Sequence, residues 1–188
     1  MEEKIQFIDL QKIDLSNVEL KGKILDIGGG GEGIIGQLKG DQVVAIDPKE
    51  SELKEATPGD YLKIIMDAKD LQFLDETFDT TTAFFTLMYI PLLEHQQVFK
   101  EIYRVTKKGG EFVIWDLRIP NRDISNKEFY GLYIKVKIKD KEISTGYATK
   151  WDKKQDLEYF LNLGTSIGFK SIEKKLMNEI FYLRFQKA

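Results

Sequence analysis

The chain contains no cysteine and a single histidine among its 188 residues. The absence of cysteine excludes disulfide bonds, thiolate metal sites and cysteine nucleophiles. One histidine cannot build a histidine-rich metal centre, so we expect no metal site. That histidine, His95, falls in a helix-like segment, and we predict it to be exposed and without a catalytic role.

The sequence also lacks a basic excess and any long apolar run. Lys and Arg number 28 against 31 Asp and Glu, a net charge of −3 that argues against a nucleic-acid partner. No apolar run approaches the length of a membrane span. The N-terminal MEEKIQFIDLQ has neither the basic start nor the apolar core of a signal peptide, so we expect a cytoplasmic protein with no membrane partner.

Strand-like and helix-like segments alternate over the first two thirds of the chain. The strand-like runs cover 23–28, 43–47, 61–66, 78–85 and 111–117, and the helix-like runs cover 32–40, 49–56 and 92–106. Such alternation is typical of parallel βαβ units with right-handed crossovers. We therefore predict an α/β fold with an open, doubly wound sheet, whose ligand binds beyond the C-terminal ends of the strands.

The long helix-like run should present one apolar face. We expect that face to be Leu92, Leu93, Val98, Phe99, Ile102 and Val105. The following Lys107-Lys108-Gly109-Gly110 should end the helix, because cations and glycine suit a helix C-terminus.

The rest of the chain is different in character. Residues 1–22 form a mildly amphipathic leader, and residues 130–148 alternate between apolar and polar around Asp140-Lys141, which predicts a β-hairpin inside an inserted segment, 119–149. A helix over 152–164 and two strand-like runs joined by Asn178 follow. The whole chain, 1–188, would then be one domain with a mostly parallel seven-stranded sheet that ends in an antiparallel hairpin.

A row of lysines occupies alternate positions of the predicted hairpin, at Lys135, Lys137, Lys139 and Lys141. The row could contact an anionic acceptor or RNA phosphates. Lysines on an exposed edge strand also prevent edge-to-edge aggregation. We favour the second interpretation, because the rest of the chain is acidic.

The stretch ILDIGGGGEGIIG, 24–36, points to a ligand. An apolar run that carries Asp26 enters four consecutive glycines and continues at helical spacing. Glycines let the backbone approach a ligand closely, and the free N–H groups of a helix start favour negative charge. Gly28-x-Gly30-x-x-Gly33 matches the dinucleotide fingerprint, with Asp47 near the distance of a ribose-binding acid, so an NAD-type oxidoreductase is one candidate.

Three other features favour a different cofactor. Asp26 precedes the first glycine by two residues, where a carboxylate could face a cationic amino group. A second acidic loop, Met66-Asp67-Ala68, follows the third strand-like run. The chain after the lysine–glycine turn ends in a hairpin and leaves no room for a separate substrate domain.

Together these segments resemble the class I S-adenosylmethionine-dependent methyltransferases, in the branch that acts on small molecules. ILDIGGGG (24–31), AIDP (45–48), MDAKDL (66–71), FDTTTAFFTLMYI (78–90) and EIYRVTKKGGEFVI (101–114) look like the five motifs of that family in order. The resemblance implies a Rossmann-like fold, S-adenosylmethionine as cofactor and methyl transfer. The commonest form of the first motif would place a third glycine at position 32, where Glu32 stands, so we expect a different loop path there.

The resemblance also implies a role for each cofactor-binding position. Asp26 would hold the ammonium group of the cofactor, Gly28 and Gly30 would approach its methionine part, and Asp47, followed by Pro48, would accept both ribose hydroxyls. The other positions are the adenine-binding Asp67, Ala68 and Leu71, and Phe84, whose backbone carbonyl would meet the amino group.

The resemblance favours one class of methyl acceptor but does not identify the acceptor itself. FFTL at 84–87 lacks the Asn/Asp-Pro-Pro-aromatic sequence of enzymes that methylate bases or protein glutamine, which favours a small-molecule acceptor. We expect acceptor contacts from Tyr89, Arg118 and Tyr133 in particular. Further candidates are Phe85, Asp116, Asn121, Tyr130, Tyr147 and Trp151.

Methyl transfer from a sulfonium is an in-line displacement that depends mainly on alignment, so we assign no catalytic residue. A general base is needed only if the acceptor must lose a proton first. Two alternatives remain: the NAD-type oxidoreductase, and a non-catalytic S-adenosylmethionine-binding regulatory or partner protein. The oligomeric state is not predicted.

Overall fold

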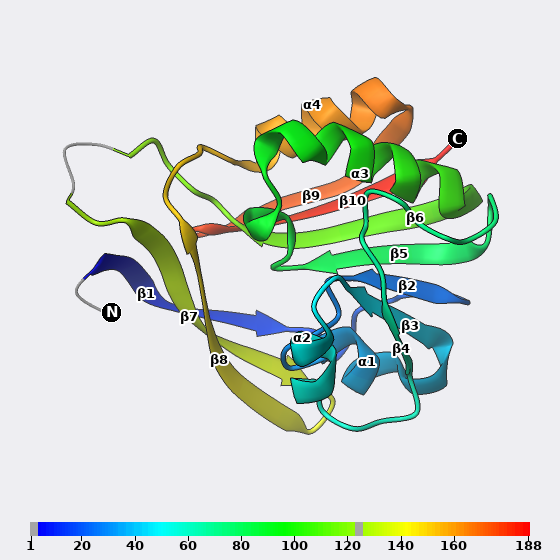
Figure 1. The fold of residues 1–188 in the computed structure, drawn as a ribbon, viewed down its shortest axis with the longest axis horizontal. Coiled ribbons are helices and arrows are strands. Elements are labelled where there is room, and N and C mark those ends of the chain that lie inside the picture. Colours follow the sequence, from blue (N-terminus) through cyan, green and yellow to red (C-terminus); the bar gives the residue numbers. More distant parts are fainter. Residues whose placement is uncertain (1–3, 123–125) are drawn as a thin grey trace.

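The computed structural model describes residues 4–122 and 126–188, which form a seven-stranded sheet, a separate three-stranded sheet and flanking helices (Figure 1). The seven strands are β2 (Ile24–Ile27), β3 (Val43–Asp47), β4 (Leu62–Ile65), β5 (Phe78–Phe84), β6 (Thr106–Leu117), β9 (Phe169–Met177) and β10 (Ile180–Lys187). Their order is β4-β3-β2-β5-β6-β10-β9, with β2 to β6 parallel and β10 antiparallel to both neighbours. The predicted α/β sheet with a terminal antiparallel hairpin is confirmed.

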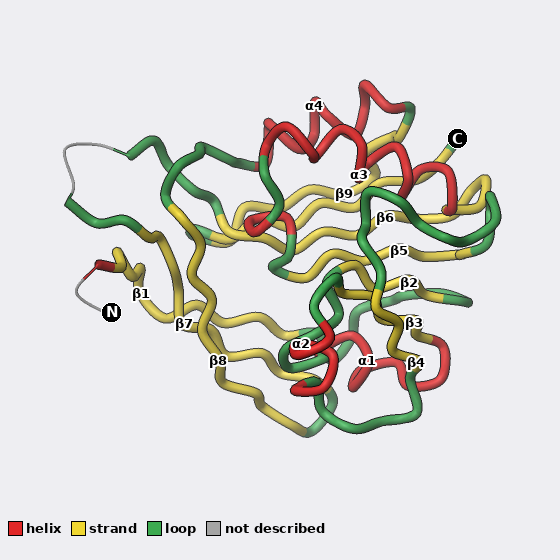
Figure 2. The backbone as a smooth tube through the Cα atoms, in the orientation of Figure 1, coloured by secondary structure: helices red, strands yellow, loops and turns green. Residues whose placement is uncertain are grey.

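Helices α3 (Leu92–Val105) and α4 (Leu157–Ile167) cover one face of this sheet (Figure 2). Phenylalanines fill that layer: the rings of Phe99 and Phe160 stack at 5.9 Å, and Phe99 meets Phe112 of β6 edge-on at 5.3 Å. Helix α4 starts later than predicted because the Asp156 carboxylate caps it, accepting a hydrogen bond from Tyr159 N at 2.8 Å.

The predicted apolar face of α3 is wrong at its N-terminal end. Leu93 is 97% exposed, and the buried stripe starts instead at His95, which is 0% exposed. The His95 ring lies within hydrogen-bond distance of Tyr159 Oη (3.0 Å) and Leu87 O (3.1 Å), and burial lowers its pKa to about 4. His95 is therefore a buried neutral side chain that ties α3 to α4 and to the loop after β5.

The C-terminal end of α3 also differs from the prediction. The helix stops at Val105, and the lysine–glycine turn already belongs to β6, whose first residue, Thr106, pairs with Phe78 of β5. Strand pairing thus begins before the glycines.

The opposite face of the main sheet is covered by α1 (Ile34–Lys39) and by the three-stranded sheet β1-β7-β8. Strands β7 (Phe129–Ile138) and β8 (Lys141–Lys150) are the predicted hairpin. The short helix α2 (Glu50–Glu55) and the 3-10 turns η2 (Gly40–Gln42) and η3 (Leu87–Tyr89) complete the elements. The inner side chains of β7 are buried in the same core cluster as α1; they are Leu132, Ile134, Val136 and Ile138.

The structure adds one strand to this region and overturns one interpretation. Within the predicted leader, Ile5–Asp14 forms β1, which pairs in parallel with β7. As a result β7 is the central strand of its sheet, and its lysines do not protect an edge. Lys135 pairs with Glu142 at 3.0 Å and Lys137 with Asp14 at 3.5 Å, so these cations are partly neutralised by neighbouring strands.

Candidate active site

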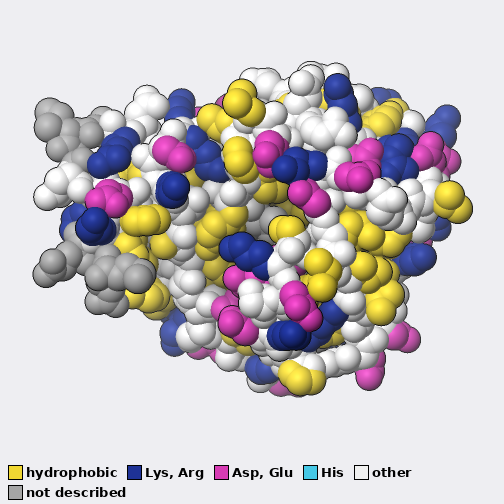
Figure 3. Space-filling view, in the orientation of Figure 1, with side chains coloured by type: hydrophobic (Ala, Val, Ile, Leu, Met, Phe, Trp, Pro, Cys, Tyr) yellow, Lys and Arg dark blue, Asp and Glu magenta, His cyan; other side chains and the backbone are white. Residues whose placement is uncertain are grey.

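A cavity of about 590 Å³ opens at the C-terminal ends of β2 to β5, the edge predicted for a ligand (Figure 3). It has two parts of different chemistry. We call the part lined by Asp26, Asp47, Asp67 and the glycine loop the acidic half, and the part lined by Phe85, Tyr89 and Tyr147 the aromatic half. The acidic half comes from the C-terminal ends of β2, β3 and β4 and the loops that follow them, whereas the aromatic half combines the loop after β5 with strand β8.

The glycine loop, 28–33, follows β2 and has a conformation that only glycine adopts without strain at several positions. Gly28 has φ 67°, and a Cβ there would collide with the Thr86 side chain, whose hydroxyl donates to Ile27 O at 2.9 Å. Gly33, at φ 62°, is the N-cap of α1. The helix thus starts after position 33 rather than 32, which explains the extra glycine and the altered spacing around Glu32.

Asp26 is 2% exposed at the end of β2, and its Oδ1 accepts a hydrogen bond from Thr82 Oγ1 at 2.7 Å. Burial raises the pKa of Asp26 to about 7, because one hydroxyl compensates a buried negative charge only in part. A cationic ligand group in the acidic half would favour the ionised form.

Asp47 and Pro48 line the same half at the end of β3. The Asp47 Oδ1 atom accepts a hydrogen bond from Lys49 N at 2.8 Å, which orients the carboxylate. Partial burial raises the pKa of Asp47. Such a fixed carboxylate can accept two neighbouring hydroxyl groups.

Asp67 and Ala68 follow β4 and line the far end of the acidic half. Ala68 is buried, whereas Asp67 is exposed and accepts from Lys69 N at 2.9 Å. Leu71, buried behind the loop, does not line the cavity.

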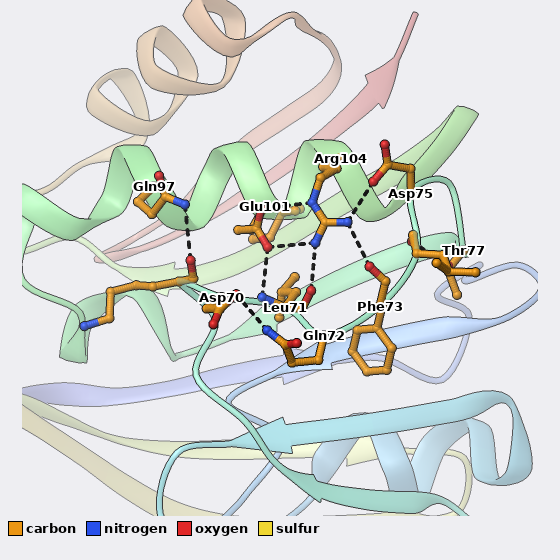
Figure 4. A network of polar contacts seen from close by, with 12 residues as sticks. Asp70, Leu71, Gln72, Phe73, Asp75, Thr77, Gln97, Glu101 and Arg104 are labelled. Carbon is orange, nitrogen blue, oxygen red and sulfur yellow. Dashed lines mark hydrogen bonds and ion pairs between the residues drawn. The ribbon is translucent and has the colours of Figure 1, made fainter.

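A network centred on Arg104 of α3 holds this loop in place (Figure 4). The guanidinium donates to Leu71 O at 2.7 Å and Phe73 O at 2.8 Å, and pairs with Glu101, whose Oε2 accepts from Leu71 N at 2.8 Å. Sequence reasoning missed this support. Its only local signal is the Glu101–Arg104 spacing of three on a helix.

The aromatic half begins where β5 ends. Phe84 and Phe85 both line the cavity, and Phe85 has φ 50°, a rare value for a bulky residue. The Phe85 ring stacks on Tyr147 of β8 with centroids 5.1 Å apart. Phe85 therefore has an unusual backbone conformation, and its ring packs against the three-stranded sheet β1-β7-β8.

Two tyrosines of the aromatic half keep their protons at neutral pH. Loss of hydration around the Tyr89 hydroxyl raises the pKa of Tyr89 to about 12. Burial and the neighbouring Glu32 carboxylate raise the pKa of Tyr147, whose hydroxyl donates to Glu32 Oε2 at 3.0 Å. These phenols can donate hydrogen bonds but cannot serve as bases.

Several predicted acceptor residues lie away from the cavity. Arg118 pairs with Glu179 at 2.8 Å, and Tyr133 stacks on Phe7 at 4.5 Å on the outer face of the three-stranded sheet. Asp116 is fully buried beneath η3, where it accepts from Met88 N at 3.2 Å and burial raises its pKa to about 7. Tyr130, Trp151 and Asn121 do not line the cavity, whereas Tyr89 and Tyr147 do.

Residues 4–122 and 126–188 hold neither a candidate metal centre nor a candidate membrane-spanning helix. No group of three His, Asp or Glu side chains there could hold a metal ion. In the same residues, no helix combines the length and the apolar character needed to cross a bilayer.

Comparison with known proteins agrees with this geometry. A family model described as a methyltransferase domain matches residues 25–114. The chain is 40% identical over 116 residues to sterol 4-C-methyltransferase strm-1 of Caenorhabditis elegans, a match that covers 58% of this chain and 32% of that protein. It is 38% identical over 68 residues to demethylmenaquinone methyltransferase of Alkalihalophilus pseudofirmus, covering 36% of this chain and 28% of that protein. The chain thus spans about a third or less of the length of these curated relatives.

The fold is also that of solved methyltransferases. An S-adenosylmethionine-dependent methyltransferase from Methanosarcina mazei superposes with a TM-score of 0.68 at 17% identity, covering 91% of this chain and 94% of that one. In sequence and in fold the chain is thus similar to the family of class I S-adenosylmethionine-dependent methyltransferases.

The cofactor of this family is S-adenosylmethionine, and the acidic half of the cavity fits it. A buried carboxylate, Asp26, is available for an ammonium group, and the orienting hydrogen bond from Lys49 N leaves Asp47 able to accept a diol. The loop also leaves open space at Gly31, where a Cβ would have only Glu52 Oε2 within 4 Å, at 3.9 Å.

Proposed function

We propose that the protein transfers the methyl group of S-adenosylmethionine to a small, neutral or cationic organic acceptor. The observation that carries this proposal is a single cavity that joins an acidic half suited to the cofactor to an aromatic half with room for an acceptor. The curated relatives' names support a small molecule, since they refer to sterols and demethylmenaquinone.

In the acidic half, Asp26 would pair with the ammonium group and Asp47 would accept both ribose hydroxyls. Asp67 and Ala68 would contact the adenine edge, and Gly28, Gly30 and the Phe84 carbonyl would contact the methionine part. Pro48 would lie beside the ribose. These roles follow from the family's motifs and from the positions of these residues along the cavity wall.

The charge of the cavity wall restricts the charge that the acceptor can carry. Carboxylates outnumber cations there: Asp26, Glu32, Asp47, Glu52, Glu55, Asp67 and Glu94 against Lys49 and Lys69. An anionic acceptor would be repelled by this wall, whereas a neutral or cationic one would not. The faces of Phe85, Tyr89 and Tyr147 suit an apolar or cationic group.

The bound cofactor supplies an activated methyl group. Asp26, Asp47 and the glycine loop would hold the cofactor so that this methyl group could be transferred in line to a lone pair of the acceptor. The residues of the aromatic half would contribute by holding the acceptor in line and excluding water. Since both tyrosines remain protonated, an acceptor that must lose a proton would give it to solvent or to a carboxylate.

Two measurements test the proposal. The melting temperature should rise with S-adenosylhomocysteine and not with NAD or NADH, because a ligand that binds the native state raises the midpoint. Stabilisation by NAD(H) alone would favour the oxidoreductase alternative. A screen with labelled methyl donor over neutral, cationic and anionic small molecules should then find turnover in the first two groups, and binding without turnover of any acceptor would favour a non-catalytic protein.

A further inference from the structure

Strand β8 lines the cavity with Gly146 and Tyr147 and is attached to other segments on both sides of this stretch. At one end Thr145 Oγ1 and Tyr147 Oη both donate to the Glu32 carboxylate of the glycine loop. At the other end Thr149 Oγ1 donates to Met88 O at 2.8 Å, in the turn after β5. Thr145, Tyr147 and Thr149 share one face of the strand, since side chains alternate along it.

Glu32 is the residue at which the loop departs from the family's commonest motif. A glycine at this position would have no side chain to reach β8. Here the two flanking glycines, Gly31 and Gly33, have φ values of 57° and 62°, and the carboxylate between them bridges two segments more than 100 residues apart in sequence. The side chain that breaks the motif is thus the one that joins the cofactor loop to the inserted sheet.

The same bridge fixes the wall of the aromatic half. Tyr147 is clamped between its hydrogen bond to Glu32 and its stacking on Phe85. Its ring lines the cavity beside Tyr89. If the Glu32 side chain were lost, the hydroxyl of the half-buried Tyr147 would need another partner, and this part of β8 would lose its attachment to the glycine loop.

We propose that Glu32 is a positioning residue: it latches β8 onto the glycine loop, so that the loop which binds the cofactor and the strand which forms the acceptor wall become ordered together. This inference rests on the proposed cofactor site and deepens it. Its consequence is that a ligand bound only in the acidic half stabilises a strand of the aromatic half.

Amide hydrogen exchange, measured with and without bound S-adenosylhomocysteine, tests the proposed role of Glu32 and needs no acceptor. In the wild-type protein the ligand should slow amide exchange about tenfold or more, both in residues 28–36 and in residues 141–150. In Glu32→Ala the slowing at 28–36 should persist, while the slowing at 141–150 should be lost. Glu32→Gln should restore much of it, because an amide reaches the same two hydroxyls and can accept from one while donating to the other.

Glu142→Ala is the matched control, since it removes a carboxylate from β8 that pairs only within the three-stranded sheet, with Lys135. It should leave the ligand-dependent slowing at 141–150 unchanged. If the ligand slowed amide exchange in β8 equally in Glu32→Ala and in the wild-type protein, the proposed role of Glu32 would be overturned. Absence of slowing at 28–36 in the wild-type protein would instead overturn the cofactor site, so the two failures are distinguishable.

Once an acceptor is known, kinetics add an independent readout. Glu32→Ala should raise the KM of the acceptor about tenfold, as expected for the loss of hydrogen bonds to a charged group, with a smaller change in cofactor affinity. A change confined to cofactor affinity would contradict the proposed role of Glu32 at the acceptor wall.

Discussion

The acidic and aromatic halves of the cavity are built in opposite ways. Each aspartate of the acidic half lies at or just beyond the C-terminal end of a strand of the main sheet, within one run of 42 residues from Asp26 to Asp67. The aromatic half brings together Phe85 and Tyr89 after β5 and Tyr147 from an inserted sheet. A site for a shared cofactor can thus be encoded locally, whereas the site for a particular acceptor depends on long-range packing.

The largest expected effect is in the acidic half. Asp47→Ala should weaken binding of S-adenosylhomocysteine by about 100-fold, since two hydrogen bonds to a charged group are lost. Isothermal titration at pH 8 measures this. Asp60→Ala is the control, because this exposed carboxylate does not line the cavity. If Asp47→Ala weakened binding of S-adenosylhomocysteine by less than threefold, Asp47 would not be the residue that accepts the ribose hydroxyls.

Asp26→Asn should change the stability of the protein and its affinity for S-adenosylhomocysteine in opposite directions. Burial raises the pKa of Asp26 to about 7, so the folded state binds this proton more tightly than the unfolded state, whose pKa is near 3.8. Ionisation therefore costs stability, which falls as the pH rises from about 4 to about 7. The asparagine variant should be more stable at pH 8, by up to about 4 kcal/mol, and should show a weaker pH dependence in urea unfolding.

The same variant should bind the ligand about tenfold more weakly at pH 8, because a cationic amino group loses its partner. In the wild-type protein, affinity should rise between pH 6 and pH 8 as Asp26 ionises. Some pH dependence of stability should remain in the variant, since burial also raises the pKa of Asp116 to about 7. An affinity in Asp26→Asn equal to that of the wild-type protein would contradict the assigned contact.

In the aromatic half, Tyr147→Phe should change the affinity for S-adenosylhomocysteine by less than about threefold, because the Thr145 bond to Glu32 remains. The free energy of unfolding should fall by about 1 kcal/mol, the usual net contribution of a hydrogen bond. Titration and urea unfolding measure the two effects. A loss of affinity as large as that of Asp47→Ala would mean that the two halves are not separate in function.

The smallest effects are expected outside the cavity. Arg118→Ala breaks an ion pair with Glu179, which contributes about 0–1 kcal/mol, and Tyr133→Ala removes stacking on Phe7. Neither change should alter the affinity for the ligand or the KM of an acceptor. A tenfold increase of the acceptor KM in either variant would show that the acceptor extends beyond the aromatic half.

The main sheet could be predicted because each of its strands is an apolar run that a turn or helix signal interrupts. The ends of β3 and β5 agree with the prediction to within a residue. Asp26, Asp47 and Asp67 line one cavity, because parallel strands that end at one edge bring the residues at their C-terminal ends together.

The inserted sheet shows where such reasoning fails. The hairpin itself was predicted from its alternation, but nothing local indicates that Ile5–Asp14 pairs with β7, 124 residues away. For the same reason Arg118 and Tyr133 were chosen by sequence neighbourhood, while Tyr147 was one candidate among several. His95 illustrates a second limit, because a lone histidine on a helix reveals its burial only when α4 and the turn after β5 are in place.

The structure of the protein with S-adenosylhomocysteine bound is the most direct test of the central claim that the two halves hold cofactor and acceptor separately. The claim predicts that Asp47 accepts the ribose hydroxyls, that the amino group lies near Asp26, and that the sulfur faces Tyr89 and Tyr147 across open space. A ligand that fills the aromatic half, or that makes no contact with Asp47, would contradict it.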